Sequence, residues 1–558
     1  MPKAETVLIQ GKGEVILTAH DHIATGGQGS VYRKGKRAFK IYTKVKEMIP
    51  VEKIKELHAI KEKNVLVPKE ILLSPRTKKP IGYTMQYLSH TEALCKLFTK
   101  GFRKTNNIKP DGIKDLVTNI QETVLKIHAA NCLVVDMNEL NFLVDDKTFK
   151  IPYFIDVDSF QTPSFPATYI MPSIRDRLAK KFTELSDWFS FAVISFQLYI
   201  GIHPYKGKHP QFKPNEWEKR MDAGISVFDK DVKLPATCQD LSVIPRAHYK
   251  WFESIFVGQD RSIPPPADTI ITAAPVSKVI KSTAEFKIEV LKEYEDPIRY
   301  VEHFNGERYV VTDKQIIWGN KFVSIATGDK AFLLSVDGGE AQDAWLSGGR
   351  LFVRVKGSTE IETEKVMAAN GALYCIQHNS LLEIRATRLG KTVTTVVEKR
   401  ANVMGESTQL FSGIIFQHIL DTCWVLVPHK LRACFYRSIP ELDGYKIIHA
   451  KYQKGICFVM AAYKGNYCRA RIRFTSNSAS APYDFKIEDA VSIDTINFVV
   501  LPNGVCVSII GDDRIEVSHD NHTRFISNPP IDSSMPLFND GQQVLFVDGS
   551  KLCSITTV

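Results

Sequence analysis

Paired-cysteine motifs, long apolar runs and a signal segment are all missing from this sequence of 558 residues. The ten cysteines include no C-x-x-C pair, and most stand inside apolar runs such as Tyr374-Cys375-Ile376. This pattern is typical of buried thiols in a reducing compartment, and it argues against a disulfide framework or a zinc site. No apolar run is long enough to span a bilayer, and the first residues contain no apolar segment followed by a cleavage site. We therefore expect a cytoplasmic protein with no membrane partner.

Charge of one sign is also scarce, because the net charge of +10 is spread thinly along the chain. The densest basic runs lie in the N-terminal part, where they more often form a solvated helix face than a nucleic-acid site, so nucleic acid is not an expected partner. A hydrophobic content of 44% allows large buried cores. The length exceeds what one core accommodates, so two to four domains are expected.

The hydrophobic pattern divides the chain into parts. Residues 1–88 have the pattern of short strands with one basic helix, residues 89–275 have mainly helical spacing, and residues 276–284 form a linker after a proline-rich tract. From 285 to 558 helical periodicity is missing, and short strands alternate with turns that contain Gly, Asn and Asp. The sequence therefore predicts a multidomain protein in which an α+β region is followed by an all-β domain.

Turn glycines recur at a fixed interval in the all-β part. Gly371, Gly413 and Gly455 are 42 residues apart in each step, and other glycines extend the series less regularly. This interval is the length of a four-stranded propeller blade. We interpret the domain as a six- or seven-bladed β-propeller, with a pair of β-sandwiches as the alternative.

The stretch from Leu125 to Gln161 carries the residues with the clearest chemistry. The end of an amphipathic helix is followed by Asp136, by Asn141 and, after an apolar strand, by Asp156. A D-x-x-x-x-N loop followed by an Asp at a strand end is how enzymes of the protein-kinase type assemble a base and a metal site. The stretch therefore predicts phosphoryl transfer.

A glycine-rich turn between two predicted strands lies upstream. Gly26, Gly27 and Gly29 would let the backbone approach phosphate oxygens, and Val31 could cover an adenine ring. A glycine cluster alone is weak evidence, because most such clusters are ordinary turns.

A lysine and a glutamate follow the turn in the order that a nucleotide site requires. Lys40 lies on the next strand between apolar neighbours and could bridge phosphates, although a solvated strand lysine is the alternative. Glu52 lies on the following helix, predicted from Val51 to Ile60, where it could pair with Lys40. Glu56 is the alternative partner.

The order of these features resembles the protein-kinase fold over residues 20 to about 265. More narrowly, it is similar to bacterial and phage kinases of the helix-hairpin-helix and tellurite-resistance-associated group. Their G-G-x-G-S-V-Y, K-I-Y and D-x-D-S-F-Q patterns stand here as Gly26 to Tyr32, Lys40 to Tyr42 and Asp156 to Gln161. The resemblance implies an α+β bilobal kinase fold, with an N-lobe at 1–88 and a C-lobe at 89–275, and it does not extend to the all-β domain.

The resemblance also implies ATP and Mg²⁺ as cofactors and assigns roles by motif. Lys40, held by Glu52, would contact phosphate oxygens, and Asp136 would accept or orient the proton of the acceptor hydroxyl. The implied catalytic residues are Asp136, Lys40 and Asn141. The implied metal ligands are Asn141 and Asp156, with Asp158 competing with Asp156. The implied nucleotide-binding residues are Ala24, Gly26, Gly27, Gly29, Val31, Ala38, Lys40, Glu52, Met85 (the gatekeeper), Gln86, Leu88 and Leu143 (the floor of the adenine pocket).

Several positions depart from the kinase pattern. Val134 and Val135 replace the His-Arg pair before the catalytic Asp, so no arginine there could respond to a phosphorylated activation loop. The segment Asp156-Val-Asp158 lacks the usual glycine hinge. Asn138 replaces the lysine of ordinary Ser/Thr kinases, as in kinase-like enzymes that act on small molecules.

Two further matches concern the scaffold. Asp187 matches the buried Asp that opens the central helix and supports the catalytic loop. Arg261 matches a late structural arginine, but the glutamate expected to pair with it is missing from Met171-Pro-Ser173.

The expected function is ATP- and Mg²⁺-dependent transfer of a γ-phosphoryl group to Ser or Thr of a protein, by an atypical serine/threonine kinase. The propeller would recognise the protein substrate or a partner. One alternative is a pseudokinase scaffold, favoured by the altered residues around Asp136 and Asp156. A second alternative is a small-molecule phosphotransferase, favoured by Asn138.

Overall fold

The computed structural model describes residues 5–557 apart from 26–27, 268–281, 284, 305, 327–329, 338, 356–358, 420–421, 430–433, 476–481, 512–513, 520–521, 528 and 542. Gly26, Gly27 and most of the predicted linker at 276–284 lie outside the described residues. No helix in the described part of the chain combines the length and apolar character needed to cross a membrane.

A seven-stranded antiparallel sheet forms the N-terminal part, which we call the sheet region. Its strand order is β2-β1-β6-β7-β5-β4-β3. The strands are β1 (Glu5–Ile9), β2 (Gly13–Leu17), β3 (His22–Thr25), β4 (Gly29–Lys34), β5 (Arg37–Tyr42), β6 (Ile71–Leu73) and β7 (Pro80–Gln86). Helix α1 (Val51–Leu57) follows β5, buries Ile54 and ends before the predicted Ile60.

A helical region follows the sheet region. Its helices are α2 (Lys100–Thr105), α3 (Pro110–Ala129), α4 (Glu184–Ile200), α5 (Trp217–Asp222) and α6 (Arg246–Phe256), and its small sheet consists of β8 (Thr91–Ala93), β9 (Phe142–Asp145) and β10 (Pro152–Phe154). Helix α4 is buried almost all round, as expected for a helix that is apolar on every side. Thr183 caps its start, and Gly201 ends it with a φ of +93°, a backbone conformation that glycine adopts without strain.

The C-terminal part, which we call the all-β region, contains seven four-stranded antiparallel sheets within the described residues. Six are built from consecutive strands, and the seventh pairs β11 with β36–β38. The strands of the first three sheets are β12 (Ile298–Phe304), β13 (Glu307–Thr312), β14 (Gln315–Trp318), β15 (Lys321–Ser324), β16 (Lys330–Ser335), β17 (Ala341–Ser347), β18 (Arg350–Val353), β19 (Thr359–Glu362), β20 (Val366–Ala369), β21 (Ala372–Gln377), β22 (Ser380–Leu389) and β23 (Thr392–Asn402). The next three sheets contain β24 (Thr408–Phe411), β25 (Ile414–Ile419), β26 (Thr422–Val427), β27 (Phe435–Ser438), β28 (Lys446–Gln453), β29 (Ile456–Tyr463), β30 (Asn466–Phe474), β31 (Tyr483–Val491), β32 (Asn497–Val500), β33 (Cys506–Ile510), β34 (Arg514–His519) and β35 (His522–Ser527). The seventh contains β11 (Phe286–Glu293), β36 (Leu537–Asp540), β37 (Gln543–Asp548) and β38 (Lys551–Thr557).

The repeated glycines occupy equivalent places in these sheets. Gly371, Gly413 and Gly455 each lie in the turn between the first and second strands of a sheet. Their φ angles are +72°, +76° and +84°, the left-handed region that favours glycine in tight turns. The interval of 42 residues therefore marks the start of successive sheets, as predicted.

Neighbouring sheets share hydrophobic clusters in chain order. Leu334 of β16 and Leu373 of β21 belong to one cluster, and Ile414 of β25 and Val459 of β29 belong to another. A further cluster joins strands β12 and β13 to β37 and β38, so the first sheet of consecutive strands also adjoins the last sheet.

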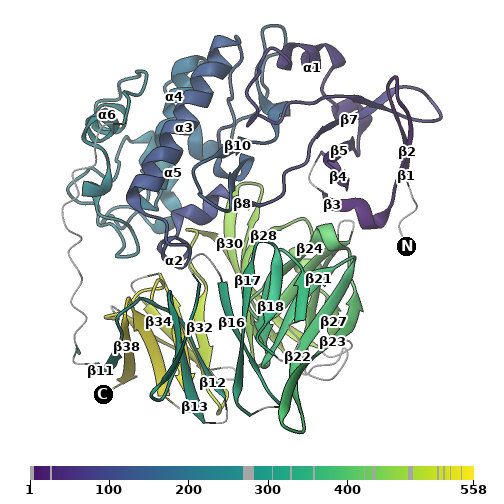
Figure 1. The fold of residues 1–558 in the computed structure, drawn as a ribbon. Helices are drawn as coiled ribbons and strands as arrows, with labels where there is room; N and C mark the ends of the chain where they lie inside the picture. The colour runs from purple at the N-terminus through teal and green to yellow at the C-terminus, as the bar shows by residue number, and fades with distance from the viewer. Residues whose placement is uncertain are drawn as a thin grey trace.

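The helical and all-β regions share a core. The hydrophobic cluster around α4 also includes Phe458 and Met460 of β29, Tyr467 of β30 and Phe498 of β32. Figure 1 shows these sheets directly below the helical region, with β28 and β30 reaching toward it. A common apolar core makes a fixed arrangement of the two regions favourable, because separating them would expose it to water.

Candidate active site

Helix α4 fixes the loop that carries Asp136. The carboxylate of Asp187, in the first turn of α4, accepts hydrogen bonds from the backbone nitrogens of Val134 (2.8 Å) and Val135 (2.9 Å). Its Oδ2 also lies 2.9 Å from Nε2 of His128 on α3. Val135 has a φ of +59°, an uncommon conformation for a β-branched residue that these bonds stabilise. Asp187 therefore holds the loop as predicted.

Asp136 is buried in a network of donors. Its Oδ1 accepts a hydrogen bond from the backbone nitrogen of Met171 (2.8 Å), and its Oδ2 accepts from the side-chain amides of Asn138 (2.9 Å) and Asn141 (3.2 Å). Burial raises the pKa of the Asp136 carboxyl above its usual range, and these hydrogen bonds lower the pKa by favouring the charged form. The carboxylate is thus oriented and more basic than a free aspartate.

Lys40 of β5 is held by carboxylates of the Asp156–Asp158 segment. Its Nζ lies 2.5 Å from Oδ2 of Asp158 and 3.1 Å from Oδ1 of Asp156. Asp158 is almost fully buried, and its two carboxylate oxygens also accept short hydrogen bonds from the hydroxyls of Tyr42 and Tyr83. Asp158 is therefore the structural partner of Lys40.

The predicted pairing of Glu52 with Lys40 is wrong. Glu52 is exposed, because the buried face of α1 consists of Lys53, Ile54 and Leu57. Lys53 donates from Nζ to the carbonyl oxygen of Asp158 (2.7 Å). The alternative partner, Glu56, instead accepts a hydrogen bond from the backbone nitrogen of Ser164 (3.1 Å). The phase of α1 therefore turns a lysine, and no glutamate, toward the site.

The two aspartates of this segment have different surroundings. The side chain of Asp156 is 42% exposed, whereas that of Asp158 is 3% exposed and engaged through both oxygens. Asp156 adopts a left-handed backbone conformation (φ 58°, ψ 44°). Its negative charge is close enough to Asp136 to raise the pKa of the Asp136 carboxyl. These surroundings favour Asp156 over the predicted alternative, Asp158, as the ligand of a metal ion.

Asn141 completes a set of oxygen donors. Its side-chain nitrogen donates to the backbone oxygen of Asp136 (3.0 Å) and to its carboxylate, so the amide oxygen remains for a cation. The backbone nitrogen of Ile155, next to Asp156, donates to the backbone oxygen of Asn141 (3.0 Å), which brings the two candidate ligands together. Carboxylate and amide oxygens are the ligands that Mg²⁺ prefers, so these residues fit the implied metal.

The implied adenine residues share one face of the sheet region. Ala24 pairs with Val31, Val31 pairs with Lys40, and Ala38 pairs with Met85 in the antiparallel ladders. Directly paired residues, and residues two apart on one strand, point to the same face. The face that carries Lys40 therefore also carries small and apolar side chains that suit a flat aromatic ring.

The remaining implied nucleotide residues are placed as follows. Leu88 and Leu143 are half-buried, and Gln86 is exposed at the end of β7. Gly29 lies at the start of β4, where a side-chain Cβ would collide with the backbone oxygen of Ile41. Glycine at position 29 is therefore required by the close approach of β4 and β5. The geometry of the phosphate turn at Gly26 and Gly27 lies outside the described residues.

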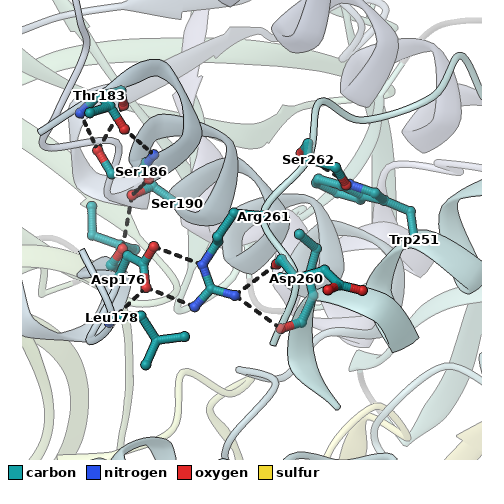
Figure 2. A network of polar contacts seen from close by, with 11 residues as sticks. Asp176, Leu178, Thr183, Ser186, Ser190, Trp251, Asp260, Arg261 and Ser262 are labelled. Atoms are coloured by element: carbon teal, nitrogen blue, oxygen red, sulfur yellow. Dashed lines mark hydrogen bonds and ion pairs between the residues drawn. The ribbon is translucent and has the colours of Figure 1, made fainter. Parts of the chain in front are cut away.

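Arg261 has a partner that the sequence pattern did not indicate. Figure 2 shows its guanidinium facing Asp176, with Nε–Oδ2 and Nη2–Oδ1 distances of 2.7 Å each. This two-pronged geometry is the strong form of an arginine–carboxylate pair. The expected glutamate in Met171-Pro-Ser173 is replaced by an aspartate slightly further along the chain, so the structural ion pair is kept.

The all-β region contacts the loop of Asp136. Tyr467 donates a hydrogen bond from its hydroxyl to Oε1 of Glu139 (2.8 Å), and Lys446 donates to the backbone oxygen of Leu140 (3.3 Å). Glu139 is buried, and burial raises the pKa of its carboxyl. These contacts join residues about three hundred positions apart, and no local motif signals them.

Comparison with protein families and with curated proteins identifies no relative of this chain. No protein-family model matches the chain, and none of the curated proteins gives a significant match.

Proposed function

We propose that the sheet and helical regions form an ATP- and Mg²⁺-dependent kinase of the bilobal α+β type, which transfers the γ-phosphoryl group to Ser or Thr of a protein. The proposal is carried by one observation. Lys40 from the sheet region touches Asp156, which in turn lies beside Asp136 and Asn141 of the helical region. A cationic side chain, a buried base and hard oxygen ligands thus meet at one boundary, as phosphoryl transfer requires.

The chain's own residues have distinct roles in this mechanism. Lys40 neutralises phosphate charge, and its geometry is fixed by the buried carboxylate of Asp158. Asp136 orients the acceptor hydroxyl and takes its proton, a role favoured by its raised pKa. Asn141 and Asp156 hold Mg²⁺. Bound Mg²⁺ supplies charge neutralisation on the phosphate oxygens.

The partner of Lys40 supports an enzyme that needs no activation step. In this chain the lysine is held by Asp158, which is on the same segment as the candidate metal ligand, and not by a residue of α1. Helix α1 contacts this arrangement through Lys53, which donates to the backbone oxygen of Asp158 and not to its carboxylate. Val134 and Val135 also stand where an arginine would bind a phosphorylated activation loop. Together with the pairing of Lys40 and Asp158, their presence favours constitutive activity.

For the all-β region we propose a closed seven-bladed propeller that recognises a protein substrate or partner. Seven four-stranded sheets, each sharing a cluster with the next and the last with the first, support closure. A pair of β-sandwiches would instead need four larger sheets. Figure 1 shows the ends of the sheets opposite the helical region facing away from the rest of the chain, where a partner could approach.

A second candidate function is phosphorylation of a small molecule. Asn138 replaces the expected lysine, and its side chain is engaged by Asp136 and by the backbone nitrogen of Leu140 (3.0 Å). No basic group therefore stands at position 138 to steady the phosphoryl group transferred to a protein.

One experiment separates these functions. The full-length protein and an Asp136→Ala variant are incubated with Mg²⁺, γ-labelled ATP and either a mixture of proteins or a protein-free metabolite extract. Label on protein that is lost in the variant supports the protein kinase, and label only on small molecules supports the second candidate. Nucleotide binding without transfer in either mixture would contradict both and favour a pseudokinase scaffold.

A further inference from the structure

A large cavity lies where the helical region faces the all-β region. Its volume is about 660 Å³, and it lies between α2 and the loop before α3 on one side and the all-β region on the other. Five sheets contribute to its lining, namely those that begin with β12, β24, β28 and β32 and the sheet that contains β36–β38. Figure 1 shows α2 next to the all-β region. A volume of this size is typical of small-molecule sites in proteins.

The charge of the lining is strongly one-sided. One acidic side chain lines the cavity within the described residues, that of Asp313. The basic residues that line it are Lys100, Arg103, Lys104, Lys109, Arg299 and Lys451. A concave surface lined mainly by one sign of charge concentrates ligands of the opposite sign.

Some of these cations already have strong partners. The guanidinium of Arg103 donates to backbone carbonyls of the helical region, and Arg299 pairs with Asp313. Lys100 lies 3.6 Å from a carboxylate oxygen of Asp532. These three side chains are structurally committed.

Two lysines from opposite walls are bonded only to neutral groups in the described part of the chain. Lys104 donates to the hydroxyl of Ser534 (3.3 Å), and Lys451 donates to the backbone oxygen of Phe498 (2.6 Å). Burial lowers the pKa of Lys451 to about 8. Loss of hydration, and then the neighbouring Lys100, lowers the pKa of Lys104. Nearby carboxylates, those of Asp532 and Asp548 for Lys104 and that of Glu302 for Lys451, raise these pKa values in part, but the loss of hydration outweighs them.

Two neutral polar groups in the lining are also unsatisfied. The hydroxyl of Thr495 and Nδ1 of His449 are shielded from solvent and have no hydrogen-bond partner among the described residues. Burial lowers the pKa of His449 to about 4, so its imidazole is neutral at physiological pH and can donate or accept. Buried polar groups without partners are uncommon and point to a group that completes them.

We propose that this cavity binds a small molecule carrying two or more phosphate groups, held between Lys104 on α2 and Lys451 on β28. The size of the cavity suits a small molecule, and the excess of basic side chains favours a polyanion. None of the candidate ATP residues lines the cavity. The ligand would contact both regions at once, and its binding would strengthen their association.

The test uses pyrophosphate as the probe and the full-length protein. Binding is measured by calorimetry, and thermal unfolding is followed with and without the probe, for wild type, Lys104→Gln and the Lys104→Gln/Lys451→Gln pair. We expect pyrophosphate to raise the melting temperature of wild type, and each lost lysine to weaken its binding about tenfold, as for a charge-assisted hydrogen bond. Lys104 donates to a neutral hydroxyl, that of Ser534, so its single variant should fold normally.

Two controls locate the bound probe. Lys287→Gln removes an exposed lysine outside the cavity and should leave binding unchanged. Lys40→Met removes the lysine of the candidate ATP site, so pyrophosphate bound at that site is lost in this variant while binding at the cavity should remain. Absence of binding to wild type, equal binding by the double variant, or loss of binding in Lys40→Met would overturn the proposal.

Discussion

The two ends of the candidate active site are stabilised in different ways. Lys40 is held within the sheet and helical regions by the buried carboxylate of Asp158, which also accepts hydrogen bonds from two tyrosines. The Asp136 loop is fixed from two sides, by Asp187 of α4 and by Tyr467 of the all-β region. The part of the site around Lys40, the lysine end, is therefore held by residues of the sheet and helical regions alone. The part around Asp136, the aspartate end, depends partly on contacts with the all-β region. This difference predicts which substitutions unfold the protein and which change its turnover.

The largest effect is expected at the lysine end. Asp158→Asn removes the charge that compensates Lys40 and weakens the bonds from both tyrosines, so the free energy of unfolding should fall by about 3–5 kcal/mol. The matched variant Asp156→Asn changes a half-exposed side chain and should alter stability by less than about 0.5 kcal/mol while abolishing Mg²⁺-dependent transfer. Chemical denaturation and phosphate transfer are measured for both. Equal destabilisation by the two variants would contradict the distinct roles.

A smaller effect is expected where the all-β region touches the loop. Tyr467→Phe leaves the buried Glu139 without its donor, so stability should fall by about 1–3 kcal/mol. Because the loop carrying the base shifts, kcat should fall about tenfold, with little change in KM for ATP. Tyr463→Phe, an exposed tyrosine on β29, is the control and should match wild type. A Tyr467→Phe enzyme with normal kcat would show that the aspartate end does not depend on the all-β region.

The pH dependence of turnover should shift when a donor to the base is removed. Asn138 donates to the charged carboxylate of Asp136 and thereby lowers its pKa. Asn138→Ser should raise the pKa of Asp136, and since a base must be deprotonated to act, activity on the acidic side should appear only at higher pH. We expect a displacement of roughly 0.5–1 pH unit, measured from kcat between pH 4 and 8 (roughly the range around an aspartate base). A displacement to lower pH would refute the proposed hydrogen bond to the charged form.

The smallest effect is expected for the residue that the sequence pattern placed in the site. Glu52→Gln changes an exposed side chain, so stability should stay within about 0.5 kcal/mol and ATP affinity should match wild type. Fluorescent nucleotide binding measures this. A marked loss of ATP affinity in Glu52→Gln would contradict this expectation and would support the pairing of Lys40 with Glu52 of α1.

Local motifs predicted the residues that lie within short, rigid segments. Asp136, Asn141 and Asp156 could be identified because a turn and a strand bring them together over some twenty positions. The role of Glu52 could not, because a rotation of α1 by one residue exchanges it with Lys53, and packing of Ile54 and Leu57 decides that rotation.

Contacts between residues far apart in the sequence could not be predicted from local sequence patterns. Asp176 replaces a glutamate at a shifted position, and Tyr467 reaches Glu139 from a distant strand. By contrast, the 42-residue glycine interval predicted the four-stranded sheets, because each left-handed turn needs glycine at an equivalent place.

Nucleotide affinity with and without Mg²⁺, measured by calorimetry on wild type, Asp156→Asn and Lys40→Met, tests most directly whether the two ends converge on one nucleotide and its metal. We predict that Mg²⁺ strengthens ATP binding to wild type, that Asp156→Asn keeps metal-free binding but loses the gain from Mg²⁺, and that Lys40→Met weakens both. ATP binding that is independent of Mg²⁺ in wild type and unchanged in both variants would contradict the account.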